Sequence, residues 1–144
     1  SAFRGEIAVA ADTLDDLVAY MRRHAAQFLE NHGIGYDFRA PDPVPDIRLQ
    51  GEQRRNIYLV VKEALHNIVK HSGATEVKIE FILDSGLTVT VHDNGKGIDL
   101  AELRRFGNGL RNMQQRMQSV GGSFEVSARD GTVVSLNCPL NAAE

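Results

Sequence analysis

Two alternating runs of residues joined by a short turn constrain the fold of this chain more than any other feature. In the first run Val77, Ile79, Phe81 and Leu83 alternate with Glu76, Lys78 and Glu80, and Asp84-Ser85-Gly86 then turns the chain back. Alternation with period two is typical of a strand with one buried face, so we expect a β-hairpin. Its second strand carries Leu87, Val89, Val91 and Asp93 on one face and Thr88, Thr90 and His92 on the other. An aspartate therefore ends the buried side of a strand, directly before Asn94-Gly95-Lys96-Gly97.

Apolar residues spaced three and four apart predict three helices. Thr13 and Asp16 form a capping pattern before the first helix, which Gly33 ends, and the second runs from about Glu52 to His71. The third begins at Gly109 and ends at Gly121. Weak alternation predicts a short strand over 34–39, three prolines in 41–45 predict an extended connector, and 124–128 with 132–140 predict a closing hairpin. This order predicts an α+β fold with helices on one face of a mostly antiparallel sheet.

Size and charge exclude several classes of protein. The chain has 144 residues, enough for one hydrophobic core. Its 16 basic and 19 acidic side chains are spread along it, so no basic stripe indicates nucleic acid or an anionic membrane. The single cysteine, Cys138, is expected to be a buried thiol, because it has no partner for an internal disulfide. No apolar run reaches the ~20 residues of a membrane span, so we expect a soluble piece. Because S-A-F-R-G-E is no obvious natural start, we expect this piece to come from a longer, membrane-attached protein.

Asp93 and the glycines after it allow two interpretations. A buried carboxylate needs a hydrogen-bond donor, which is either an arginine or backbone amide of the protein or an amino group on a flat heterocyclic ligand. Gly95 and Gly97 have no side chains to obstruct a ring or a phosphate, but Asp-Asn-Gly is also an ordinary turn. The common phosphate-binding fingerprints are absent: Leu100 occupies the third glycine position of G-x-G-x-x-G, and no P-loop occurs.

The polar face of the second predicted helix also has two readings. At 100° per residue Glu63, Asn67 and Lys70 lie on one line, opposite the apolar face. An amide oxygen with substrate phosphates suffices for Mg²⁺, a carboxylate can accept a proton and an amine can bind a phosphate; alternatively the face is simply solvated. Gly107 and Gly109 offer free N–H groups to an anion at a helix start, or form a flexible cap. His66 and His71 are five residues apart, which does not fit a zinc helix, so we expect no histidine metal ligand.

Three motifs, in order, resemble those of sensor histidine kinases. K-E-A-L-H-N-I-V-K-H is similar to their N box, D-N-G-K-G-I to their first glycine box, and G-N-G-L-R-N-M to their second. The closing G-T-V-V-S-L-N-C-P-L is similar to the family's last strand, so the resemblance runs from about Arg54 to Leu140. The E-A-L-x-N-x-x-K-H form and the short lid indicate the nitrate-sensor-like branch, in which glutamate replaces the first asparagine of the N box.

The resemblance implies the Bergerat, or GHKL ATPase, fold, which is a two-layer α/β sandwich with a mixed sheet, and it implies binding of ATP with Mg²⁺. Asp93 would accept a hydrogen bond from the adenine amino group, and Thr132 would assist adenine recognition. Asn67 would hold Mg²⁺, and Glu63 would be the general base that activates the receiving histidine. The other implied ATP-binding residues are Gly95, Gly97 and Ile98 against the base, Lys70 and His71 near the phosphates, and Gly107, Asn108, Gly109 and Leu110 in the lid and its helix start.

The family's phosphoacceptor motif, a histidine followed by an acid, is absent from this chain. His24 in R-R-H-A-A lacks that context and reads as an ordinary surface histidine. We therefore expect the catalytic and ATP-binding domain of a larger sensor kinase, in which residues 1–45 form a leading helix, strand and connector of the same domain and 46–144 form the ATP-binding core. The implied partners are a separate dimerisation and phosphoacceptor domain and, indirectly, a response regulator. We expect a cytoplasmic domain of a bacterial inner-membrane protein, monomeric or weakly associating by itself.

Two other functions stay open at the level of the sequence. A serine kinase of the anti-sigma-factor type would share the fold, but the E-x-x-x-N spacing argues against it. A non-catalytic nucleotide-binding module would not need the complete set of Glu63, Asn67, Asp93 and both glycine pairs.

Overall fold

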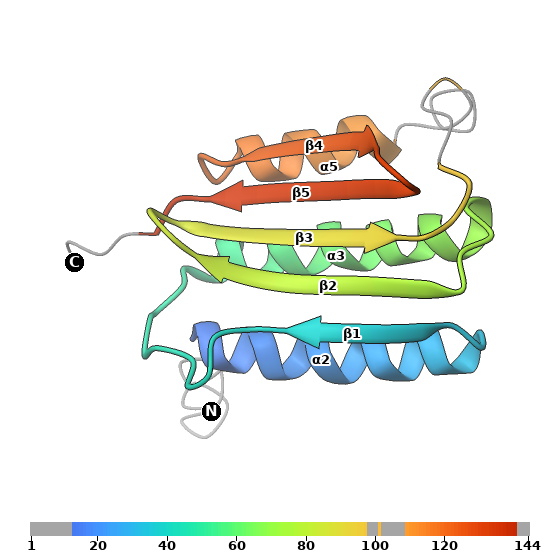
Figure 1. The fold of residues 1–144 in the computed structure, drawn as a ribbon. Helices are drawn as coiled ribbons and strands as arrows, with labels where there is room; N and C mark the ends of the chain where they lie inside the picture. The colour runs from blue at the N-terminus through green and yellow to red at the C-terminus, as the bar shows by residue number, and fades with distance from the viewer. Residues whose placement is uncertain (1–12, 98–100, 102–108, 141–144) are drawn as a thin grey trace, which may run out of the picture.

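The computed structural model describes residues 13–97, 101 and 109–140. In this part of the chain three helices lie on one face of a five-stranded sheet (Figure 1). The helices are α2 (Leu14–Asn31), α3 (Gly51–His71) and α5 (Gly109–Gln118), and the strands are β1 (Gly35–Arg39), β2 (Glu76–Leu83), β3 (Leu87–Asp93), β4 (Ser123–Ala128) and β5 (Thr132–Cys138). The strand order is β1-β2-β3-β5-β4. Only β1 and β2 run parallel among these neighbours, so the predicted two-layer fold with a mixed, mostly antiparallel sheet is confirmed.

Helix α2 begins and ends where its capping residues predict. The Thr13 hydroxyl accepts a hydrogen bond from the Asp16 amide at 3.1 Å, and Gly33, two residues before β1, takes a positive φ of 69°. The apolar face of α2, which includes Leu17, Met21 and Leu29, is fully buried in the same core as the other elements. Because β1 pairs with β2, α2 and β1 extend the sandwich by one helix and one edge strand.

The central hairpin fixes the position of Asp93. In the register of β2 and β3, Val77 lies opposite Asp93 at one end and Leu83 lies opposite Leu87 at the other. Burial alternates along β3, and Asp93 is only 1% exposed. The carboxylate therefore shares the helix-covered face of the sheet with the apolar residues of β3, as the alternation predicts.

Helix α3 crosses behind the middle of the sheet and carries the predicted polar line on its outer side. Ile57, Val61 and Leu65 are buried, whereas Glu63 and Lys70 are exposed and Asn67 is half-buried. Met113 and Met117 bury the inner side of α5, which packs against α3. Within the described residues no helix combines the length and apolarity needed to cross a bilayer.

Candidate functional site

Asp93 has one satisfied and one unsatisfied carboxylate oxygen. Its Oδ1 accepts a hydrogen bond from the Gly95 amide at 2.7 Å, while the buried Oδ2 has no hydrogen-bond partner among the described residues. Leaving a buried carboxylate oxygen without a donor is costly, so such an oxygen usually marks an absent partner. An amino group on a planar base fits this need. A backbone amide thus binds one carboxylate oxygen, and the other oxygen leaves a position for a donor from a ligand.

The glycines around Asp93 are required by backbone contacts. A Cβ on Gly95 would overlap the carbonyl oxygen of Ser72, and the next amide, that of Lys96, donates to this oxygen at 3.0 Å. A Cβ on Gly131, whose φ is 112°, would overlap the carbonyl oxygen of Asp93. Gly97 has a φ of 88°, and the place where its Cβ would be lies 3.5 Å from the Gly131 carbonyl oxygen and 4.0 Å from the Ala128 Cβ, so the backbone conformation rather than crowding favours glycine there.

The other predicted binding residues lie around the same end of the sheet. Thr132 is buried at the start of β5 and directly precedes Val133, which pairs with His92. Because the two strands are antiparallel, the same register brings Thr132 alongside Asp93. On α3, the Glu63 carboxylate lies 3.7 Å from the place where a Cβ of Gly109 would be. The fold therefore brings the start of α5 next to the polar line of α3.

The predicted magnesium residue has chemistry that suits that ion. Asn67 presents an amide oxygen, and the residues that the structure describes contain no cluster of three or more histidine, cysteine or acidic side chains able to cage a metal. Mg²⁺ commonly takes one or two protein oxygens and completes its shell with phosphates and water. Asn67 together with nucleotide phosphates fits that pattern. His71 is half-buried at the end of the same helix.

Several predicted residues have no described surroundings. Ile98, Gly107 and Asn108 lie outside the described residues. Leu110 is half-buried in the first turn of α5. Sequence reasoning missed Ser72, Asn94 and Gly131, whose contacts shape the turn after Asp93. The Asp-Asn-Gly and Arg-Asp-Gly turns are signals for Asn94 and Gly131, but neither turn contains Ser72.

The structure corrects the prediction that His24 is an ordinary surface histidine. Its ring centroid lies 6.0 Å from that of Phe28 and 6.0 Å from that of Tyr58, and its buried Nε2 has no hydrogen-bond partner among the described residues. Burial lowers the pKa of His24, and the positive charge of Lys62 and the neighbouring His66 lower it further. The ring therefore lies between α2, which carries it, and Tyr58 of α3.

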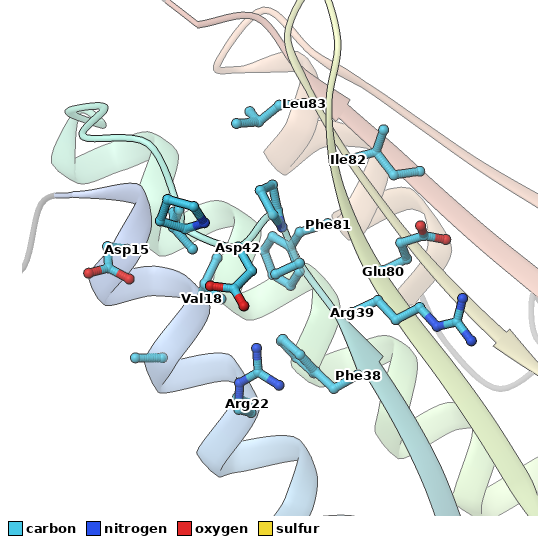
Figure 2. Close-up of a pocket in the computed structure, with 15 residues that line it drawn as sticks. Asp15, Val18, Arg22, Phe38, Arg39, Asp42, Glu80, Phe81, Ile82 and Leu83 are labelled. Atoms are coloured by element: carbon cyan, nitrogen blue, oxygen red, sulfur yellow. The ribbon is translucent and has the colours of Figure 1, made fainter.

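A cavity of about 980 Å³ lies at the opposite end of β2 from Asp93 (Figure 2). It is lined by α2, β1, the proline-rich connector and the end of β2, where the guanidinium of Arg22 lies 4.6 Å from the centre of the Phe38 ring. None of the predicted site residues lines this cavity. A smaller cavity of about 340 Å³ touches Asp93 and Asn94 at the ends of the strands. The larger cavity is therefore separate from the predicted nucleotide site, despite its size.

Comparison with protein families and curated proteins gives the relationship. Residues 52–142 match the family described as histidine kinase-, DNA gyrase B-, and HSP90-like ATPase. The chain is 33% identical over 108 residues to the sensor protein VraS of Staphylococcus aureus strain COL, which covers 73% of this chain and 28% of that protein. It is 32% identical over 111 residues to VraS of Staphylococcus epidermidis strain ATCC 12228 / FDA PCI 1200, and this match covers 75% of this chain and 29% of that protein. The chain thus spans less than a third of these relatives.

Solved structures agree with this relationship. The histidine kinase domain of the blue-light activated histidine kinase of Erythrobacter litoralis EL346 superposes with a TM-score of 0.71 at 28% identity, covering 90% of this chain and 64% of that one. The ATP binding domain of PrrB from Mycobacterium tuberculosis gives a TM-score of 0.69 at 25% identity, and the match covers 90% of this chain and 96% of that one. None of these relatives places the chain in the nitrate-sensor-like branch, which stays a prediction. The chain belongs to the histidine kinase-, DNA gyrase B- and HSP90-like ATPase family, as an ATP-binding catalytic domain of the histidine kinase type.

Proposed function

We propose that this domain binds ATP with Mg²⁺ between the end of β3 and the polar line of α3, and that it phosphorylates a histidine on a separate dimerisation domain. The observation that carries the proposal is the buried Asp93 Oδ2, which lacks a donor among the described residues at the end of the sheet. The adenine amino group would supply that donor. Guanine would instead turn a carbonyl oxygen toward the carboxylate, which would repel it.

The remaining side chains fit separate parts of the nucleotide. Asp93, Thr132 and Gly97 would lie against the base, and Gly95 would keep the turn against Ser72. Asn67 would hold Mg²⁺, with Lys70 and His71 near the phosphates. Ile98 would lie against the base, and Gly107, Asn108, Gly109 and Leu110 would form the lid and its helix start.

Glu63 is proposed as the general base. It is exposed on the outer side of α3, so an incoming side chain can reach it, and it lies next to the start of α5. ATP, when bound, supplies the phosphoryl group. Phosphoryl transfer depends mostly on positioning and on neutralisation of charge, and Glu63 would orient the acceptor imidazole and take up its proton.

The acceptor and the other partners are part of the same proposal. The histidine kinase relationship supports a dimerisation domain that carries the acceptor histidine and a response regulator that receives the phosphoryl group afterwards. We propose a cytoplasmic placement of this domain in a parent protein anchored in the membrane. The leading residues 1–45 and the core 46–144 would act as one domain.

Calorimetric titration of the protein with Mg-ATP and with Mg-GTP tests the nucleotide assignment. We expect binding of Mg-ATP and clearly weaker binding of Mg-GTP, because guanine carries a carbonyl oxygen at the position where adenine carries the amino group that would donate to Asp93. Absence of binding to either nucleotide would reject the proposal. Equal affinity for both would reject the role of Asp93 as the adenine-reading residue.

A further inference from the structure

The side chain of Asn94 joins two segments that are distant in the sequence. Its Oδ1 accepts hydrogen bonds from the amides of Thr75 at 2.9 Å and Glu76 at 3.0 Å, and its Nδ2 donates to the Thr75 hydroxyl at 2.9 Å. The backbone amide of Asn94 also donates to the Glu76 carbonyl oxygen at 3.2 Å. Asn94 is exposed, yet both polar atoms of its side chain bind the turn that follows α3.

The same turn holds the glycine stretch at a second point. The Ser72 carbonyl oxygen accepts from the Lys96 amide at 3.0 Å, at the place where Gly95 has no Cβ. The buried Ser72 hydroxyl donates to the Ile68 carbonyl oxygen at 2.8 Å and accepts from the Ala74 amide at 3.2 Å. Residues 94–96 are therefore attached, through the turn 72–76, to the last turn of α3.

We infer that Asn94 is a positioning residue that sets the place of the Asp93–Gly97 turn relative to α3. This inference rests on the proposed function, in which Asp93 meets the base and the α3 residues Asn67 and Lys70 meet the magnesium and the phosphates. The hydrogen bonds of Asn94 fix the separation of these two groups before a ligand arrives. Preorganisation of this kind raises affinity because less ordering remains to be done on binding.

The exposed position of Asn94 separates this role from general stability. Water can replace the lost partners of an exposed side chain, so the hydrogen bonds contribute little to global unfolding. Their loss should instead loosen residues 94–96 locally. Asn137 is a matched control, because it is also exposed and its Nδ2 donates to a threonine hydroxyl, that of Thr88, at 3.1 Å, on a strand and away from Asp93.

The test compares wild type, Asn94→Ala and Asn137→Ala by calorimetry with Mg-ADP and Mg-GDP, by urea denaturation and by amide hydrogen exchange without nucleotide. For Asn94→Ala we expect about tenfold weaker binding of Mg-ADP, a smaller preference for ADP over GDP, and exchange of the Lys96 amide faster by about tenfold. Its urea midpoint should stay close to that of Asn137→Ala, whose ADP affinity should match wild type.

Three results would overturn the inference. They are wild-type ADP affinity in Asn94→Ala, equal losses of affinity in Asn94→Ala and Asn137→Ala, or an unchanged exchange rate at Lys96. Loss of ADP binding that is accompanied by a collapse of the urea midpoint in Asn94→Ala would also count against a local role. If wild type itself bound no ADP, the proposed function would fail, and the positioning role would fail with it.

Discussion

Asp93 is the last residue of β3, it accepts a hydrogen bond from the turn that follows, and it is the proposed contact to the base. Its Oδ1 is held by the Gly95 amide and its Oδ2 is open, so Asp93→Asn removes the charge while keeping the size. We expect this change to weaken Mg-ATP binding by about 1.5–3 kcal/mol, the range for a charge-assisted hydrogen bond. Calorimetry measures this loss of affinity. Asp84→Asn is the control, because it makes the same change of charge at an exposed position. Equal affinity of Asp93→Asn and wild type would contradict the assigned contact.

Glu63 and Asn67 are expected to separate chemistry from binding. A general base acts in the transition state, so Glu63→Gln should slow phosphotransfer while leaving nucleotide affinity nearly intact. Asn67→Ala should instead weaken the magnesium-dependent part of binding. Titrations with and without Mg²⁺, followed by transfer rates, distinguish the two variants. Phosphotransfer by Glu63→Gln at the wild-type rate would show that another group is the base.

His24 should make the domain sensitive to acid. Burial, Lys62 and His66 lower its pKa below the ordinary value of 6.5, so the unfolded chain takes up a proton at a higher pH than the folded one. The contribution of His24 to the free energy of unfolding is therefore complete above about pH 6.5, and it falls as the pH drops below that value toward the lowered pKa of the folded state. Urea denaturation at pH 7.5 and 5.5 should show a larger loss for wild type than for His24→Gln. Equal losses would remove His24 as the cause.

At the scale of elements, α2 depends on residues at its ends as well as on its buried face. The Thr13 hydroxyl caps α2, and its own O–H donates to the Asp16 carboxylate at 3.0 Å. Thr13→Ala should lower the free energy of unfolding by about 1 kcal/mol, and Thr13→Ser should retain most of it. Urea denaturation measures both. Nucleotide affinity should not change, because α2 carries none of the proposed binding residues; a parallel loss of affinity would show that α2 reaches the site.

At the scale of the whole molecule, the domain holds a proposed base and a proposed nucleotide site but lacks a recognisable acceptor. Phosphoryl transfer needs a nucleophile in line with the γ-phosphate, and the half-buried His24 packs against Phe28 and Tyr58 instead. We expect no self-labelling with radiolabelled ATP, and labelling on histidine of an acceptor domain from the parent protein added in trans. Acid-labile label on this protein that disappears in His24→Ala would place the acceptor inside this chain.

Patterns of near neighbours in the chain were sufficient for the elements and for much of the proposed site. Burial of one face of β3 follows from its alternation, the ends of α2 follow from Thr13 and Gly33, and the three motifs indicated the family. These features could be predicted because their causes lie within a few residues of one another. The position of Asp93 on the covered face is one of them.

Contacts between distant segments required the folded chain. The parallel pairing of β1 with β2, the Gly131 turn against Asp93 and the burial of His24 beside Tyr58 each join residues that no local pattern links. The hydrogen bonds between Asn94 and Thr75 span 19 positions, so the sequence indicates only a turn at a place where the structure shows two distant segments joined. Periodicity determines which side of an element is buried, whereas the identity of its neighbour depends on how all the elements pack together.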